Sequence, residues 1–172
     1  TNNVGGLIGD NHGNVTNGRN NGTITGVKYV GGMVGSNGKN STLTNLVNDS
    51  SAEILGVNYV GGIAGNNSGV ITADKNNDNL INRGSITGYQ YVGGVAGLNT
   101  GTITNTNNDV ELHVNTAVIG GTGAQYFGGV VGQNGTDLNY GIIENAMNSN
   151  TIIAPDASYV GGIVGWNTEK GQ

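Results

Sequence analysis

The sequence predicts an all-β fold: a parallel β-solenoid (β-helix) of about five to six coils of 26–35 residues, with roughly three short strands per coil. Three observations predict it. One phrase recurs along the chain, the pieces between its copies have strand chemistry, and the chain varies in length only between pieces. Self-similarity at a period of about 20–50 residues is typical of stacked repeats. We therefore expect residues 1–172 to form a single repeat domain that is a fragment of a longer array.

The recurring phrase reads aromatic-Val-Gly-Gly-apolar-apolar-Gly-x-Asn, and its first full copy runs from Tyr29 to Asn37. Further copies lie at 59–67, 91–99, 126–134 and 159–167, and an earlier copy at 3–11 has Asn3 in place of tyrosine. The first glycine of each pair marks one coil, and the markers are Gly5, Gly31, Gly61, Gly93, Gly128 and Gly161. Six copies at intervals of 26 to 35 residues indicate one structural unit per period.

Two shorter pieces accompany each phrase. One precedes the tyrosine, as in Thr23-Ile24-Thr25, and the other follows the asparagine, as in Thr102-Ile103-Thr104. An Asn-x-x-Asn phrase, such as Asn45 to Asn48, then leads into the next period. Pieces rich in Ile, Val and Thr between Gly and Asn are typical of strands separated by turns. No piece has the apolar spacing of an amphipathic helix, so we expect almost no α-helix.

The lengths of the connections indicate where the corners lie. The Gly-Gly-x-x-Gly-x-Asn core keeps its length in every copy, whereas 73–78 and 106–115 are longer, polar and rich in Asn and Asp. Stacked strands must keep register, whereas turns extend into solvent without disturbing it. The insertions therefore mark corners of the coil.

Stacking would place equivalent residues of adjacent coils about 4.8 Å apart, so that identical side chains form columns. Amide side chains both donate and accept, and the predicted asparagine ladder consists of Asn11, Asn37, Asn67, Asn99, Asn134 and Asn167. A glycine column, which requires either positive φ or close approach to a neighbour, contains Gly9, Gly35, Gly65, Gly97, Gly132 and Gly165. An offset-stacked tyrosine ladder contains Tyr29, Tyr59, Tyr91, Tyr126 and Tyr159.

Three apolar columns are predicted to form the walls of the core. The first contains Val4, Val30, Val60, Val92, Phe127 and Val160. The others contain Ile24, Ile54 and Ile86, and Val15, Leu43, Ile71, Ile103 and Ile143. A Gly-rich chain with few bulky side chains cannot fill one wide core, so these walls must enclose a thin one, built coil by coil.

Composition argues against several partners. The formal net charge is −5 and the six basic residues are scattered, whereas nucleic-acid binding needs clustered Lys and Arg. We expect no nucleic-acid partner, and no membrane insertion, since no stretch approaches the length of an apolar span. Cysteine is absent, and His12 and His113 lie several coils apart, so we expect no metal site. The sequence points to no catalytic residue and no cofactor, and leaves any ligand-binding residue unknown.

Two alternatives to a purely structural role remain open. The carboxylates of the two long connections suit a β-helix enzyme acting on polysaccharide, or a Ca²⁺ site, and they are Asp74, Asp78, Asp109 and Glu111. Trp166 and the tyrosines suit a glycan-binding module. Trp166 shares its column with such varied residues, among them Asp10 and Gln133, that we expect the column to face solvent.

The phrase Tyr-Val-Gly-Gly-apolar-apolar-Gly-x-Asn, followed by Gly-x-Ile-Thr-Asn, resembles the GLUG repeat. That family is named for a Gly-Leu-bulky-Gly core, which Gly6-Leu7-Ile8-Gly9 matches literally and Gly32-Met33-Val34-Gly35 matches with one exchange. Departures are Asn3 for tyrosine, Phe127 for valine, and the corner insertions. The repeat occurs in large bacterial surface proteins, including filamentous-haemagglutinin-like adhesins and non-catalytic regions of IgA-cleaving metalloproteases.

The resemblance implies secretion, display at the bacterial cell surface, and a non-enzymatic role as a stalk or adhesive segment. It supplies no catalytic residue that this chain shares. The expected partners are neighbouring repeats of the same polypeptide and a host-cell or biofilm protein or glycan.

Overall fold

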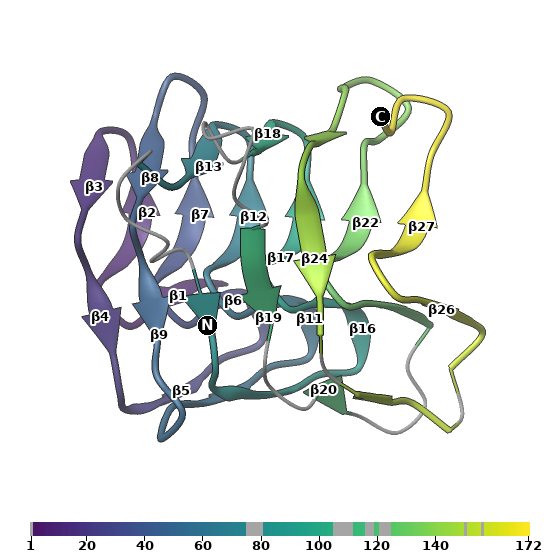
Figure 1. Cartoon of the computed structure of the whole chain (residues 1–172), viewed down its shortest axis with the longest axis horizontal. Helices are drawn as coiled ribbons and strands as arrows, with labels where there is room; N and C mark the ends of the chain where they lie inside the picture. Colours follow the sequence, from purple (N-terminus) through teal and green to yellow (C-terminus); the bar gives the residue numbers. More distant parts are fainter. Residues whose placement is uncertain are drawn as a thin grey trace.

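The fold was analysed in a computed structural model that describes residues 2–74, 81–104, 112–115, 119–120, 125–149, 151–155 and 157–172. Within these ranges all regular structure is β-strand, and every strand pairing is parallel. Figure 1 shows the coils side by side along the long axis, from the purple N-terminus to the yellow C-terminus. The predicted parallel β-solenoid is confirmed.

The repeated phrase forms two adjacent sheets. Sheet A contains β1 (Asn2–Gly5), β6 (Lys28–Gly31), β11 (Asn58–Gly61), β16 (Gln90–Gly93), β21 (Tyr126–Gly128) and β26 (Tyr159–Gly161). Sheet B contains β2 (Ile8–Asn11), β7 (Val34–Asn37), β12 (Ala64–Asn67), β17 (Ala96–Asn99), β22 (Val131–Asn134) and β27 (Val164–Asn167). Each sheet therefore takes one strand from each of the six copies of the phrase.

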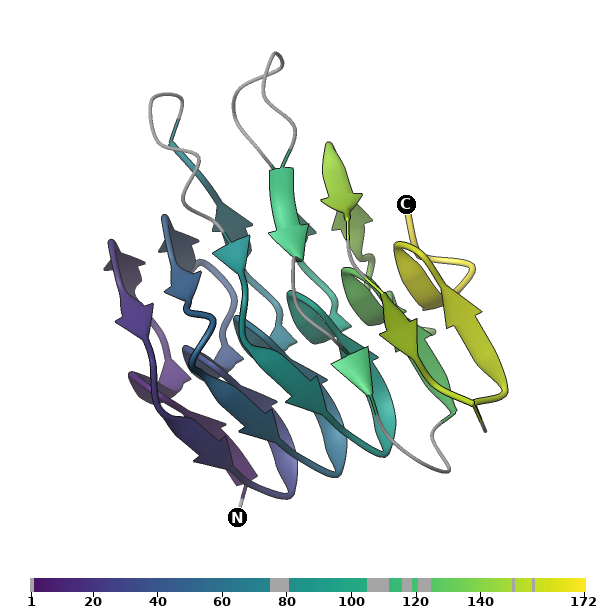
Figure 2. The ribbon, with the colours of Figure 1, turned by 60° about the horizontal axis from the view of Figure 1, so that its bottom comes forward.

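Three further sheets complete the coil. Sheet C contains β3 (Asn14–Thr16), β8 (Thr42–Thr44), β13 (Val70–Thr72), β18 (Thr102–Ile103) and β23 (Ile142–Ile143). Sheet D contains β4 (Arg19–Asn20), β9 (Val47–Asn48), β14 (Ile81–Asn82), β19 (Leu112–Asn115) and β24 (Ala146–Asn148). Sheet E contains β5 (Thr23–Thr25), β10 (Glu53–Leu55), β15 (Ser85–Thr87), β20 (Ile119–Gly120) and β25 (Ile152–Ile153). Figure 2 shows the same coils following one another from the purple coil at the left to the yellow coil at the right.

Equivalent residues of successive coils pair in register. Ile54 is the Cα partner of both Ile24 and Ile86, and Val60 is the partner of both Val30 and Val92. A one-residue slip would turn every inward side chain outward, so a core that needs these residues inside fixes the register.

The coil has five short strands, where the sequence suggested roughly three. The glycine phrase is not one strand, because the chain bends at Gly32 and Met33 between β6 and β7. The Asn-x-x-Asn phrase also contributes a strand, the two-residue β9. Turns supplied by glycine pairs shorten the strands without changing their order.

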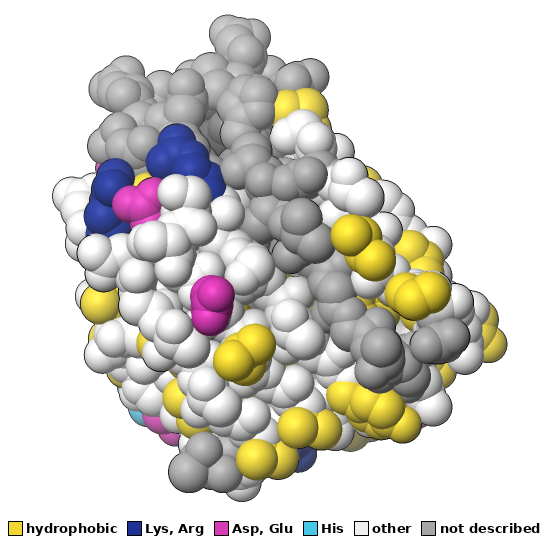
Figure 3. All heavy atoms as spheres, turned by 90° about the horizontal axis from the view of Figure 1, so that it is seen from below, with side chains coloured by type: hydrophobic (Ala, Val, Ile, Leu, Met, Phe, Trp, Pro, Cys, Tyr) yellow, Lys and Arg dark blue, Asp and Glu magenta, His cyan; other side chains and the backbone are white. Residues whose placement is uncertain are grey.

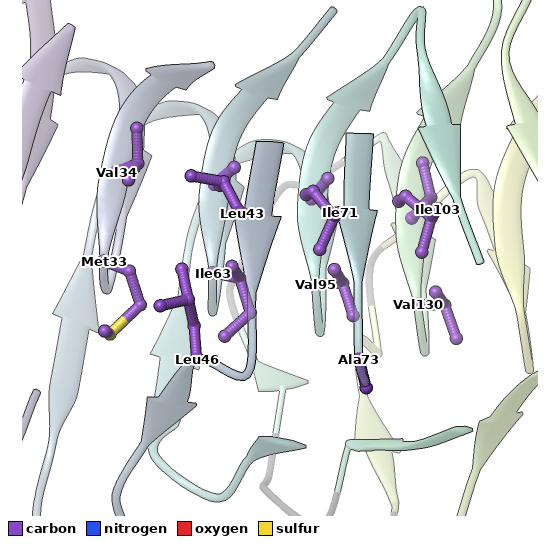
Figure 4. Packing of buried hydrophobic residues seen from close by; sticks show 13 residues of the cluster. Met33, Val34, Leu43, Leu46, Ile63, Ile71, Ala73, Val95, Ile103 and Val130 are labelled. Atoms are coloured by element: carbon purple, nitrogen blue, oxygen red, sulfur yellow. The ribbon is translucent and has the colours of Figure 1, made fainter. Parts of the chain in front are cut away.

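The core is a thin double strip. One cluster lies between sheets B, C and D and includes Met33, Leu43 and Ile63, all fully buried (Figure 4). The second lies between sheets A and E and contains Val30, Val60, Val92, Phe127, Ile54, Ile86 and Ala52. The predicted apolar columns are thus buried in the middle coils. Burial of each Val or Ile contributes roughly 1.5–3 kcal/mol, so stability accumulates coil by coil.

Candidate functional site

The asparagine ladder forms a continuous hydrogen-bonded column at the end of sheet B. The Nδ2 of each asparagine donates to the Oδ1 of its counterpart in the next coil. The distances from Asn11 to Asn37, and onward to Asn67, Asn99, Asn134 and Asn167, are 2.9, 2.9, 2.8, 2.9 and 3.0 Å. Asn37, Asn67 and Asn99 are fully buried.

Each ladder amide also supports the adjacent corner. Besides its bond to Asn99, the Nδ2 of Asn67 donates to the carbonyl oxygens of Gly69 and Thr102 at 3.3 Å. The Nδ2 of Asn99 similarly donates to the carbonyl of Ile142 at 3.2 Å. These amides therefore add hydrogen bonds to carbonyl groups of the adjacent turn and tie that turn to the ladder.

A second asparagine ladder escaped the sequence analysis. In sheet D, Asn20 donates to Asn48 at 2.9 Å and Asn48 donates to Asn82 at 2.7 Å. Asn48 and Asn82 are fully buried, and register continues the column through Asn115 and Asn148. The sequence signal for this ladder is the Asn-x-x-Asn phrase, whose second asparagine is Asn20, Asn48 or Asn82 in the first three periods.

The tyrosine ladder lies on the outside of sheet A. Ring centroids of neighbours from Tyr29 to Tyr159 lie 5.2, 4.7, 4.8 and 5.0 Å apart, and the last three pairs are nearly parallel, at 6°, 5° and 4°. Such pairs contribute about 0.5–1.5 kcal/mol each beyond burial. Lys28 lies 4.7 Å from the ring of Tyr29 at the N-terminal end.

Three of the five tyrosines have an unusual backbone conformation. Tyr29, Tyr59 and Tyr91 have φ values of 51°, 55° and 52°, in the left-handed region that bulky residues rarely adopt. The conformation costs roughly 1–2 kcal/mol per residue, which ring stacking offsets. It turns each ring outward, while the next residue, such as Val60, still points into the core.

The glycine column allows the backbones of adjacent coils to approach each other closely. A Cβ on Gly65 would overlap the backbone of Tyr29, and a Cβ on Gly97 would overlap the backbone of Tyr59. Neither glycine has positive φ. Of the two needs that the sequence left open, the structure therefore shows the second: Gly65 and Gly97 each face the left-handed tyrosine of the preceding coil.

Packing within the tyrosine ladder raises the pKa of two of its hydroxyl groups. Burial raises the pKa of the Tyr59 hydroxyl above its ordinary value of 10.0, and the neighbouring Tyr91 and Tyr29 raise it further. Burial also raises the pKa of Tyr91, with a smaller contribution from Tyr126. Each inner ring has a neighbouring ring against both of its faces, so it presents mainly its edge to solvent.

The column of Trp166 only partly faces solvent. Asp10 is exposed, but Gln133 is buried and its Nε2 donates to the carbonyl of Gly135 at 3.0 Å. Trp166 lies against the tyrosine ladder, with its ring centroid 5.0 Å from Tyr126, and remains 38% exposed. The expectation of a solvent-facing column therefore fails at Gln133, because the indole of the next coil lies against the neighbouring ladder.

Of the four candidate carboxylates, the structure describes only Asp74. Asp74 accepts a hydrogen bond from Asn45 at 2.8 Å, and its own N–H donates to Asn45 Oδ1 at 2.9 Å. Asp78, Asp109 and Glu111 lie outside the described residues, as does the side chain of His113. His12 faces Asp10 at 3.5 Å on the surface.

Charged side chains are few on the face that Figure 3 shows. Figure 3 shows one face, on which white backbone and uncharged polar side chains predominate, with basic and acidic groups gathered toward one side. Arg19 and Asp49 form an ion pair at 2.6 Å. In the part of the chain that the structure describes, no three His, Asp or Glu side chains are grouped to hold a metal ion. No helix that could cross a membrane occurs in those same residues.

A family model described as the GLUG motif matches residues 123–153. This stretch contains β21 to β25, one complete coil. No curated protein matches the chain, and no solved structure does. The resemblance seen in the repeated phrase is confirmed for this coil, whose neighbours repeat its pairing strand for strand.

Proposed function

Because residues 123–153 carry the GLUG motif and the other coils repeat the same architecture, we propose that the chain is a non-enzymatic structural segment of a secreted or surface-displayed bacterial protein. It acts as a stalk, or as a lateral surface that binds a partner. The observation that carries the proposal is that the hydrogen-bonded asparagine ladder runs through all six copies of the phrase.

The ladders suit a load-bearing spacer. Each internal coil is bound to both neighbours by parallel strand pairing and by buried amide chains, so no coil bends without breaking several bonds. Each added coil lengthens the stack by about 4.8 Å. Length is therefore set by copy number while the cross-section stays constant.

Adhesion would use the lateral surface. Corners differ in length from coil to coil, and they carry variable polar side chains on an invariant scaffold. Loops on a rigid scaffold are where binding residues are usually found. We propose that the partner is an extracellular protein or glycan of a host cell or a biofilm.

Deletion of one complete period tests the modular role. Removal of residues 57–88 joins Gly56 to Tyr89 and takes one strand from each sheet. We expect a folded protein with a β-type circular dichroism spectrum, a cooperative thermal transition and a long axis shorter by about 4.8 Å in small-angle scattering.

Deletion of half a period, residues 57–72, is the matched control. It puts non-equivalent residues in register and should abolish cooperative unfolding. Loss of folding in the full-period deletion, or tolerance of both deletions alike, would contradict the proposed modular stalk.

A further inference from the structure

The outside of the corner between sheets E and A carries an exposed apolar column. Val27, Val57 and Tyr89 are equivalent residues of three successive coils. The N–H of Val57 donates to the carbonyl oxygen of Val27 at 3.3 Å, and the N–H of Tyr89 donates to that of Val57 at 3.2 Å. Val57 has a coil on either side of it and is still 45% exposed. Its exposure therefore belongs to the lateral face of the stack.

A polar column lies between this apolar column and the tyrosine ladder. It contains Lys28, Asn58 and Gln90, which pair in register in sheet A. Lys28 Nζ lies 4.7 Å from the ring centroid of Tyr29, so the polar column borders the ladder. From residue 57 to residue 126 the described members of the three columns carry no charge, and we call them the corner face: Val57, Asn58, Tyr59, Tyr89, Gln90, Tyr91, Gln125 and Tyr126.

The shape of the corner face suits a thin, linear ligand better than a folded protein. A stable protein interface takes about 20–30 residues from each side. The apolar column of this face is one residue wide, with Val57 and Tyr89 as its exposed side chains. Equivalent groups recur about every 4.8 Å along the stack, which is close to the length of one sugar residue in an extended chain. A polymer of that period meets the same three columns at every coil.

The chemistry of the corner face suits a sugar. Amide side chains donate and accept hydrogen bonds, as sugar hydroxyl groups do. Asn58 Oδ1 is buried and has no hydrogen-bond partner among the described residues, so it gains a donor when the amide turns toward a ligand hydroxyl. Tyr89 lies outside the tyrosine ladder and is 49% exposed, so its ring can lie against the apolar face of a sugar ring. An anionic ligand would bring charges that nothing on the corner face pairs.

We infer that the corner face binds a linear, uncharged polysaccharide whose chain lies along the stack axis, with one sugar residue per coil. The inference rests on the proposed role as an extracellular binding segment and names the chemical class of its partner. The inner ladder rings, such as Tyr91, contribute their edges, because neighbouring rings cover their faces. Trp166 takes no part, since it belongs to a column of sheet B.

Isothermal titration calorimetry of the 172-residue chain with cellopentaose, a straight and uncharged chain of glucose, tests the inference. We expect cellopentaose to bind at least about tenfold more tightly than cellobiose, because the longer chain contacts several coils at once. A dextran oligosaccharide contains the same sugar in a flexible chain and should bind at least about tenfold more weakly than cellopentaose, since it loses more conformational entropy on binding.

Substitutions on and off the corner face locate the site. Tyr89→Ala and Asn58→Ala should each raise the Kd for cellopentaose at least about fivefold, as loss of a principal contact does. Neither change removes a buried apolar group, so the thermal midpoint should stay near that of the native chain. Tyr140→Ala is the matched control, because Tyr140 is 55% exposed but lies between β22 and β23, and this variant should bind like the native chain.

Three results would each overturn the inference. The chain may bind none of the glucose oligosaccharides, as a protein-specific surface would. Tyr89→Ala and Asn58→Ala could both keep the native Kd for cellopentaose. Heparin, an anionic glycan, could bind more tightly than cellopentaose. All three would leave the modular stalk intact, since deletion of one period tests that role separately.

Discussion

Replacement of Gly97 by alanine is expected to destabilise the fold by more than about 3 kcal/mol, at or beyond the upper end of overpacking costs in protein cores. The added methyl group would overlap the backbone of Tyr59 in the preceding coil. Backbone atoms cannot rotate away as a side chain does, so β17 in sheet B would have to move away from β11 in sheet A, against which it packs. Urea unfolding measures the effect as a fall in midpoint at unchanged slope.

Gly13→Ala is the matched control, since a Cβ at Gly13 meets nothing within 4 Å. It should change the free energy of unfolding by less than about 0.5 kcal/mol, the usual range for surface changes. If Gly97→Ala unfolds at the same urea concentration as Gly13→Ala, the coils are not packed at the separation described.

Asn67→Asp is expected to cost about 3–5 kcal/mol at neutral pH, as an uncompensated buried charge does. Asn67 is fully buried, and the substitution removes the amide that donates to Asn99. The new carboxylate would also place an oxygen against the Oδ1 of Asn99. Thermal melting of the variant and the native chain in parallel measures the loss.

The same variant should recover stability in acid. Burial raises the pKa of the introduced carboxyl above its unfolded value of about 3.9. The neutral acid, which donates as the amide did, is the form that the fold accepts. Its stabilisation is present below the unfolded pKa and is lost as pH rises through the folded pKa.

Asn66→Asp, one residue away on the outer side of β12, is the control. Asn66 is half-buried and donates to Ser36 Oγ at 3.3 Å, so its replacement should have a small effect that varies little with pH. Equal losses for Asn66→Asp and Asn67→Asp would mean that the asparagine ladder does not stabilise the stack.

The sequence was sufficient to predict the coil period and the stacked columns. At six equivalent positions the side chain must hydrogen-bond the same corner of the coil. The same residue therefore recurs there, as at Asn37 and Asn67, and the recurrence can be seen in the sequence. The same reasoning placed Ile54 between Ile24 and Ile86. Repeats reveal any constraint that every coil shares.

Features that depend on contacts between unlike residues could not be predicted. Tyrosine normally favours extended backbone, so the tyrosine itself does not signal the left-handed φ of Tyr59. Gln133 is buried beside Trp166, which is the single tryptophan of the chain. Strand β9 has two residues, too few for alternation to be recognised.

Disulfide trapping tests the central claim, the direct stacking of equivalent residues, most directly. The chain contains no cysteine, so an introduced pair is unique. Ser36 and Asn66 are Cα partners in adjacent coils, and Asn66 and Leu98 are partners in the next pair. Adjacent strands lie about 4.8 Å apart, within the Cα separation of about 4.4–6.8 Å that a disulfide spans, whereas two coils lie about 9.6 Å apart.

Thiol alkylation followed by mass measurement under mild oxidation gives the readout. The double variant Ser36→Cys with Asn66→Cys should lose both free thiols within the monomer, and Ser36→Cys with Leu98→Cys should keep both. Free thiols in the first variant together with a disulfide in the second would contradict the stacked solenoid.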